Sequence, residues 1–547
     1  MIVRILFLLC ILFSLQYTFT YADDEIKCLT FPIRKSEKLK DKVLGVVYFD
    51  STGRPKNQCV AFSPNRLFAV HYDTTGANKV PSLDSNRNGI PDYVDSALSY
   101  LEQAYYLYVN EMGFDPPPKD SGRGGGDEYD FYLWDIGNGY YEEVAYGWTV
   151  ADIEIKSPFV YPRYACFSVI DNDFSPFDTT FFASGNKRPT YRETGYLGLK
   201  ITTAHELHHL FQFGYGDPLF PSINEMTSTF MEWRVYPETK DYLQFVKSLF
   251  NDFSKYILAD PTYYVGYRYA IFLQYLYKRF GDFPIVELWR NVGRGNNPLL
   301  SLDLALKEKG SSFSDVIANF LPYLFYTGSN FRPNLLPNAE LFPPIKYNYE
   351  TTFSNSLMLL HRLKPFELRP VRIFLPSESP ETLDDTLIVF LANLDTKSAI
   401  NQNLDSSREC TIVLSKSNTN GNQLYPREIY YDFIGDRNLI ADSLFLTFGF
   451  RTFSVSYPFP NPCKISKEPI NFPVPYNATV RSVVELRIFD SFMKEIPLPK
   501  NDFNVSIYEK RRVIHFERFP VELPSGVYFF KITSGGNDIL GKFTVVD

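Results

Sequence analysis

Three residues in one short stretch have the types and spacing of a zinc site. Residues 201–213 read ITTAHELHHLFQF and contain the pattern H-E-x-x-H at His205, Glu206 and His209. On an α-helix, positions i and i+4 lie on one face a turn apart, so both imidazoles can hold one Zn²⁺. A bound metal makes its water ligand more acidic, and Glu206 would be the general base that takes a proton from this water. His208 lies off this face, and we expect it to make no metal contact.

A third protein ligand must lie elsewhere, because zinc hydrolases keep three protein ligands and one open position. No histidine follows His209 closely, which removes the extended pattern HExxHxxGxxH. The next predicted helix carries two carboxylates, Glu225 and Glu232, in NEMTSTFMEW. The intervening GYGDPLFPSI is long enough for an antiparallel return. We predict Glu225 as the third ligand, with Glu232 as the alternative ligand or a carboxylate just outside the metal.

A tyrosine hydroxyl could steady the oxyanion that forms at such a metal. The stretch PTYYVGYRYAIF supplies several, of which Tyr267 is our candidate. The chain has 39 tyrosines, so packing in the core is the competing interpretation.

A second site is predicted in residues 84–95, which read DSNRNGIPDYVD. Gly89 falls where an EF-hand-like loop must turn sharply, and the last position holds Asp in place of the usual Glu. We predict a structural Ca²⁺ site; the alternative is an Asn/Gly turn with an Asp helix cap. The predicted oxygen donors are Asp84, Asn86, Asn88, the Ile90 carbonyl, Asp92 and Asp95.

The elements that must position these residues can be read from hydrophobic periodicity. Residues 240–328 are predicted mostly helical, and short β-like runs follow the Pro-rich stretch FRPNLLPNAELFPPIKY. The predicted class is α+β: a zincin-like domain at 67–330, followed by two all-β sandwich-like modules at 335–455 and 456–547. Around the motifs we predict strands at 67–73, 129–135 and 165–171, and helices at 92–110, 198–213 and 224–236.

The N-terminus has the pattern of a secretory signal peptide. A positive residue, Arg4, precedes an apolar run, and Thr20-Tyr21-Ala22 resembles a cleavage site, so residues 1–22 are the predicted signal. Residues 23–66 form a predicted cap or propeptide-like segment. Export implies an oxidising compartment, in which Cys28 and Cys59 could bridge. No cysteine has C-x-x-C spacing, so we expect no thiolate metal site.

Composition narrows the function classes. The 547 residues carry a formal net charge of -8, and the mild acidic excess argues against a nucleic-acid binder. Beyond the signal, no apolar stretch is long enough to cross a membrane, so the mature chain should have no transmembrane segment.

Several segments together resemble a family of secreted bacterial metalloproteases, over about residues 67–290. They are HYDTTGANKVPSLDSNRNGIPDYVD, GGDEYDFYLWDIG, CFSVIDNDF, TTAHELHHLFQFGYG and NEMTSTFMEW. The resemblance implies a zincin fold of the gluzincin type, with His205, His209 and Glu225 as ligands and Glu206 as base. Met226 and Ser228 replace the family's usual Gly and Ala.

The last ninety or so residues resemble a type IX secretion sorting domain. The matching pieces are YPFPNPCK, VELRIFDSFMKEI, LPSGVYFFKI and GKFTVVD. Met493 stands where such domains usually have a turn glycine. The resemblance implies interaction with a secretion machinery, export through the periplasm, and release or attachment at the cell surface.

Two functions from different classes are compatible with these patterns. The first is a secreted zinc-dependent endopeptidase acting on proteins or peptides. The second is a non-catalytic adhesion or binding protein on a retained zincin scaffold. The intact pair of histidines with Glu206 beside them favours the enzyme.

Overall fold

The structure is a computed structural model. Two compact units make up the chain, and each is described by itself. The residues that the structure describes are 27–31, 53–137, 145–156, 158–181, 187–255, 257–260, 263–352, 356–375, 385–416, 443–448, 458–465, 467–474, 478, 482–508, 511–534 and 537–546. The predicted signal peptide and most of the predicted cap therefore lie outside the described residues.

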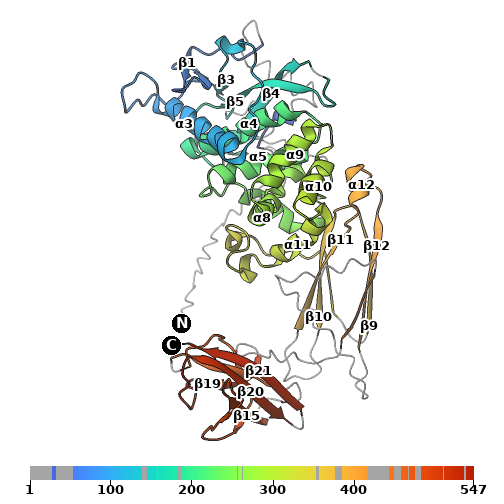
Figure 1. The fold of residues 1–547 in the computed structure, drawn as a ribbon. Coiled ribbons are helices and arrows are strands. Elements are labelled where there is room, and N and C mark those ends of the chain that lie inside the picture. The colour runs from blue at the N-terminus through green and yellow to red at the C-terminus, as the bar shows by residue number, and fades with distance from the viewer. Residues whose placement is uncertain are drawn as a thin grey trace, which may run out of the picture. The chain divides into compact units, whose positions relative to one another are not determined.

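The first unit begins with a five-stranded mixed sheet (Figure 1). Its spatial order is β1-β2-β3-β5-β4, in which β2, β3 and β5 run parallel while β4 is antiparallel to β5. Strand β4 is consequently an edge strand. The bounds are β1 (Cys59–Phe62), β2 (Phe68–Tyr72), β3 (Tyr129–Trp134), β4 (Gly147–Ile155) and β5 (Arg163–Asp171).

Two helices, α3 (Asp92–Tyr106) and α4 (Gly195–Tyr215), pack against this sheet, and α5 (Pro221–Val235) packs against α4. Helix α4 contacts β4 and β5 on one side and α3 and α5 on others. It is buried nearly all round, which explains why its sequence is not clearly amphipathic. Helix α3 continues as a π-helical turn, Leu107–Met112.

The remaining helices of this unit confirm the prediction that residues 240–328 are mostly helical. Gly281 lies just after α8 with φ +68° and ψ −155°, a backbone conformation that glycine adopts more easily than other residues. The bounds are α6 (Leu243–Asn251), α7 (Tyr263–Arg268), α8 (Ala270–Phe280), α9 (Phe283–Gly293), α10 (Pro298–Glu308), α11 (Phe313–Phe325) and, farther along the chain, α12 (Thr396–Ile400).

The second unit is built of strands. Two three-stranded sheets, in the orders β11-β10-β8 and β13-β12-β9, occupy the region of the predicted middle module. Residues 376–384 and 417–442 of that module lie outside the described residues. The bounds are β8 (Tyr349–Thr352), β9 (Ser356–Leu363), β10 (Leu368–Leu375), β11 (Asp385–Ala392), β12 (Arg408–Lys416) and β13 (Ser443–Phe448).

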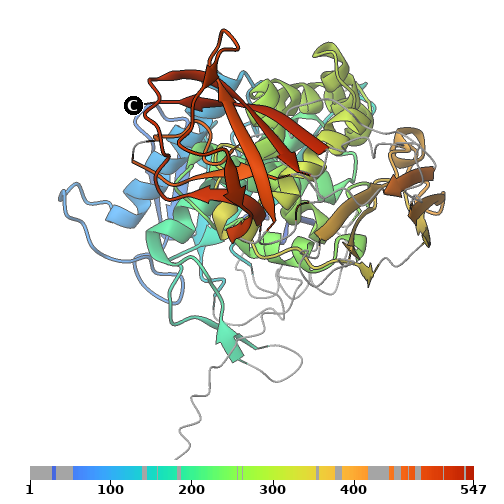
Figure 2. The ribbon, with the colours of Figure 1, turned by 90° about the horizontal axis from the view of Figure 1, so that it is seen from below.

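The C-terminal region forms two sheets around a common core that includes Phe472, Leu486 and Phe530. Strands β15 and β20 alternate buried and partly exposed residues, as sandwich strands should. Figure 2 shows the same strands, in red, turned by 90°. The bounds are β14 (Ile470–Pro473), β15 (Val483–Phe489), β16 (Glu495–Ile496), β17 (Asp502–Asn504), β18 (Ser506–Tyr508), β19 (Arg511–Phe516), β20 (Gly526–Ser534) and β21 (Asn537–Val545).

The structure bears out the α+β class, and it shows a strand upstream of residue 67. Strand β1 pairs with β2 inside the sheet, so the first unit includes residues placed in the predicted cap, upstream of residue 67. A four-residue strand shows too little alternation to be seen in the sequence. No helix in the described part of the chain is long and apolar enough to cross a membrane.

Candidate metal centre

The two predicted histidine ligands point their Nε2 atoms at one place. His205 and His209 are one turn apart on α4, both buried, with their Nε2 atoms 3.2 Å apart. Glu225 on α5 brings its Oε2 to 3.1 Å from the Nε2 of His205 and 3.8 Å from that of His209. The structure therefore brings the three predicted ligands together.

These distances fit a zinc ion. Tetrahedral coordination with bonds of about 2.0 Å places nitrogen and oxygen ligand atoms about 3.3 Å apart. The second carboxylate oxygen of Glu225, Oε1, is buried and has no hydrogen-bond partner among the described residues. A buried oxygen in that state is costly unless a cation is nearby.

A second layer of side chains orients the two imidazoles. The Nδ1 of His205 lies 2.7 Å from Glu232 Oε1, and the Nδ1 of His209 lies 2.8 Å from Gln212 Oε1. Carboxylate and amide oxygens accept, so Nδ1 donates in both rings and Nε2 is left for a metal. Glu232 is therefore a positioning residue here, and the alternative that placed it on the metal is wrong for this geometry.

The electrostatics favour positive charge between the two glutamates. Burial opposes protonation of His205, but hydrogen bonds to Glu225 and Glu232 outweigh it and raise the pKa of His205 to about 10. Burial, together with the nearby His205, lowers the pKa of His209 well below its ordinary value. A proton is thus favoured on His205 and disfavoured on the neighbouring His209.

Glu206 lies beside the ligands, facing the sheet. Its Oε2 accepts a hydrogen bond of 2.8 Å from Thr149 Oγ1, and Thr149 belongs to the edge strand β4. Burial raises the pKa of Glu206 to about 7, while His205 opposes the shift. A carboxylate with a pKa near neutrality is suited to accept and return a proton. Thr149 gave no signal in the sequence, because the contact spans 57 residues.

Tyr267 reaches the same centre from α7. Its hydroxyl accepts a hydrogen bond of 3.1 Å from the backbone N–H of Cys28, and its ring stacks on Phe245. A Cβ on the preceding Gly266 would lie 2.2 Å from the Ser222 carbonyl oxygen, so only glycine lets α7 approach α5 this closely. The position is compatible with a donor to an oxyanion, and that role stays a prediction.

A cysteine is the unforeseen member of the cluster. Cys28, His205, His209 and Glu225 each offer a ligand atom, and these atoms all lie within 4.8 Å of one another. Cys28 and Cys59 are both free, so the bridge considered between them does not form. The expectation of no thiolate metal site rested on the absence of C-x-x-C spacing, and it did not consider a cysteine brought to the histidines by the fold. Cys28 is close to the two histidines in the fold, although it is far from them in the sequence.

His208 behaves as expected of a residue off the ligand face. Its Nδ1 lies 3.0 Å from Ser228 Oγ, and its ring packs edge-on against Tyr108, Phe114 and Trp289. It stabilises the contact between α4 and its neighbours, away from the metal ligands.

The predicted calcium loop folds into a compact turn ahead of α3. The side-chain amides of Asn86 and Asn88 both donate to Asp95 Oδ2 at 2.9 Å, and Gly89 N donates to Asp84. Asp92 is turned toward Ser85, from which it accepts two hydrogen bonds. The loop thus brings together the side chains of Asp84, Asn86, Asn88 and Asp95, and Ile90 lies between the last two of these in the sequence. Binding of Ca²⁺ stays a prediction.

A buried acidic cluster that we did not predict lies near the ends of β3 and β5. The carboxylates of Asp135, Asp171 and Asp178 offer oxygens within 4.8 Å of one another. Burial raises the pKa of Asp171 to about 6, and burial together with the neighbouring aspartates raises the pKa of Asp178 to about 7. Asp171 accepts hydrogen bonds from Ile136, Gly137, Asp173, Phe174 and Tyr191, which indicates a structural role.

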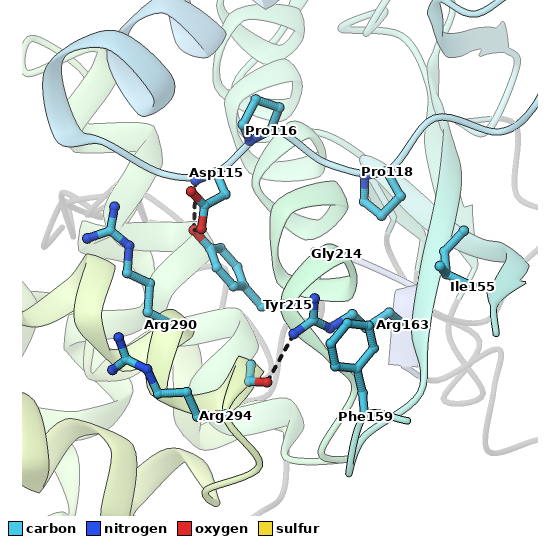
Figure 3. Close-up of a pocket in the computed structure, with 11 residues that line it drawn as sticks. Asp115, Pro116, Pro118, Ile155, Phe159, Arg163, Gly214, Tyr215, Arg290 and Arg294 are labelled. Atoms are coloured by element: carbon cyan, nitrogen blue, oxygen red, sulfur yellow. Dashed lines mark hydrogen bonds between the residues drawn. The ribbon is translucent and has the colours of Figure 1, made fainter. Parts of the chain in front are cut away.

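A separate pocket of about 630 Å³ opens at the C-terminal end of α4 (Figure 3). Arg163 donates to the Gly293 carbonyl at 3.0 Å, and Tyr215 donates to Asp115 at 3.1 Å. None of the metal-centre residues lines this pocket. The lining side chains labelled in the figure include three guanidinium groups, those of Arg163, Arg290 and Arg294.

Comparison with protein-family models gave no match for this chain, and comparison with curated proteins gave none either.

Proposed function

We propose that this chain is a secreted zinc-dependent endopeptidase with a gluzincin-type centre. The observation that carries the proposal is the arrangement of two imidazole Nε2 atoms and one carboxylate at tetrahedral separations, with a buried carboxylate beside them. His205, His209 and Glu225 would hold Zn²⁺. When bound, the metal would polarise a peptide carbonyl and make water more acidic.

The protein's own groups perform the remaining work in this proposal. Glu206 takes a proton from the attacking water and returns it to the leaving amine, and Thr149 holds its carboxylate toward the centre. Glu232 and Gln212 keep the two imidazoles in their metal-facing orientation. Tyr267 would donate its hydroxyl hydrogen to the developing oxyanion.

The test compares the native chain with Glu206→Gln. Bound zinc is measured in both proteins. Hydrolysis of an unfolded protein substrate is measured in both before and after the chain has been treated briefly with trypsin. We expect Glu206→Gln to keep its zinc and to lose about 10²–10⁴-fold in rate, the usual contribution of a general base. Glu238→Gln is the matched control, since Glu238 is exposed and pairs with Lys200. Zinc without hydrolysis in either sample would favour the binding-protein alternative.

Export is the second part of the proposal. Residues 1–22 would direct the chain across the inner membrane, and the C-terminal sandwich would be recognised by a type IX secretion machinery. The compact core around Phe472 supports an independent folding module. Deleting residues 456–547 should leave the protein in the periplasm of a secreting host, whereas unchanged extracellular yield would contradict this part.

A further inference from the structure

A short N-terminal segment, residues 27–31, lies along the open edge of the sheet. Tyr146 N donates to the Lys27 carbonyl at 2.9 Å, and Leu29 N donates to the Gly147 carbonyl at 3.1 Å. Thr149 N donates to the Thr30 hydroxyl at 2.8 Å. Extended peptides bind proteins by adding to an edge strand in this manner. The segment therefore occupies a position suited to a peptide substrate.

Lys27 anchors this segment in a buried acidic site. Its side chain is 3% exposed, and its Nζ lies 2.7 Å from Glu232 and 2.5 Å from Asp241. Burying a charge is costly unless it is paired, and Lys27 is paired twice. Because Glu232 also orients His205, the anchor is connected directly to the metal centre.

The next residue brings sulfur to the ligands. The Sγ of Cys28 lies 3.5 Å from the Nε2 of His209, and the residue is fully buried. Zinc–sulfur and zinc–nitrogen bonds of about 2.3 Å and 2.0 Å at a tetrahedral angle put the two atoms about 3.5 Å apart. The sulfur also lies within 4.8 Å of the ligand atoms of His205 and Glu225, so it is close enough to all three predicted ligands to join them.

We propose that the Cys28 thiolate is the fourth ligand of the metal, and that residues 27–31 thereby keep the centre closed until they are removed. The ligand assignment stands on geometry; the consequence, latency, rests on the proposed peptidase function. On binding, Cys28 releases its thiol proton to solvent. On opening, the sulfur takes up a proton and leaves, so that water and a substrate carbonyl gain access.

The sequence next to the segment suggests how it is removed. Residues 34–42 read RKSEKLKDK and carry five basic side chains, Arg34, Lys35, Lys38, Lys40 and Lys42. A protease that cuts after Lys or Arg would separate residues 27–31 from the rest of the unit. The segment would then be held only by its non-covalent contacts.

Two spectroscopic measurements on the full chain without its predicted signal peptide test the ligand. X-ray absorption of the zinc-loaded chain should show one sulfur scatterer at about 2.3 Å, with the rest nitrogen and oxygen. Cobalt-substituted protein should show a thiolate-to-cobalt charge-transfer band in the near ultraviolet. Both signals should vanish in Cys28→Ser and persist in the matched control Cys59→Ser. Absence of sulfur around the metal in the native chain would overturn the proposal without any need for a variant.

Measurements of peptide hydrolysis test the role of Cys28 separately from the proposed peptidase function. In the uncut chain, Cys28→Ala should raise the rate of peptide hydrolysis at least tenfold, and trypsin treatment should raise the native rate to a similar level. A sulfur signal without hydrolysis in any form would uphold the ligand and contradict the peptidase. Full hydrolysis by the uncut native chain, dependent on Glu206 and with no sulfur signal, would uphold the peptidase and contradict Cys28 as a ligand.

Discussion

At the scale of single residues, Glu232 is a carboxylate that orients one of the proposed metal ligands, His205. Its two oxygens bind His205 Nδ1 at 2.7 Å and Lys27 Nζ at 2.7 Å. Glu232→Gln keeps an acceptor but loses the charge that favours a basic, correctly oriented imidazole. We expect zinc affinity to fall about 10–100-fold, the usual effect of losing such a partner. The zinc affinity is measured by competition with a chromogenic chelator.

The matched control for this prediction is Glu238→Gln, which changes the same residue type at an exposed position. It should leave zinc affinity unchanged. Equal affinities for native protein and Glu232→Gln would show that His205 does not need this partner.

A second residue-scale prediction concerns the loop before α3. If the Asp84 loop binds Ca²⁺, millimolar calcium should stabilise the protein by about 1–3 kcal/mol, given the affinities typical of extracellular loops. Asp84→Asn should remove most of that gain, because it deletes a charged ligand. Asp127→Asn, at an exposed position outside the loop, should retain it. Thermal unfolding with and without calcium is the measurement, and a gain that survives Asp84→Asn would exclude this loop as its source.

At the scale of elements, the contact between α4 and β4 depends on one glycine. A Cβ on Gly147 would lie 2.8 Å from the Val169 carbonyl oxygen and 3.2 Å from Glu206 Cγ. Gly147→Ala should therefore cost about 1–3 kcal/mol through overpacking and should displace the Glu206 carboxylate. The free energy of unfolding, measured with denaturant, should fall, and so should the proposed peptide hydrolysis after trypsin treatment. Gly526→Ala, whose new Cβ would make only ordinary contacts, should leave them unchanged.

The hairpin between β15 and β16 contains a strained position. Met493 has φ +62° and is largely exposed. A side chain in the left-handed region costs about 1 kcal/mol that glycine avoids. Met493→Gly should therefore stabilise the C-terminal sandwich by about 1 kcal/mol in denaturant unfolding. Phe492→Gly, next to it without a positive φ, should give no gain, and a loss in Met493→Gly would contradict the strain.

At the scale of the whole molecule, the buried acidic cluster should make stability depend on pH. Asp178 titrates in the unfolded chain near its ordinary value of 3.8, and in the folded protein near 7. Its stabilising contribution is present below the unfolded pKa and is lost as pH rises toward the folded pKa. The native protein should therefore lose stability from about pH 4 to pH 7 through this group.

Replacing Asp178 by Asn removes that titration. The fall in melting temperature between pH 4 and pH 8 should be smaller in Asp178→Asn than in the native protein. Asp127→Asn, exposed and outside the cluster, should follow the native curve. Identical curves for native protein and Asp178→Asn would show that the carboxyl does not titrate in this range.

The sequence alone was enough to predict the features that depend on the local geometry of a helix. Two histidines at i and i+4 face one point on any helix, so His205 and His209 could be assigned before the structure, and the predicted helix 198–213 differs from α4 only at its ends. Glu225 was predicted as the third ligand because only a short return separates the two helices. The tertiary structure alone decided the rest, since Cys28 lies 181 residues from His209 and Thr149 lies 57 from Glu206. Such contacts have no spacing in the sequence, because chain folding, and not helical or strand periodicity, brings them together.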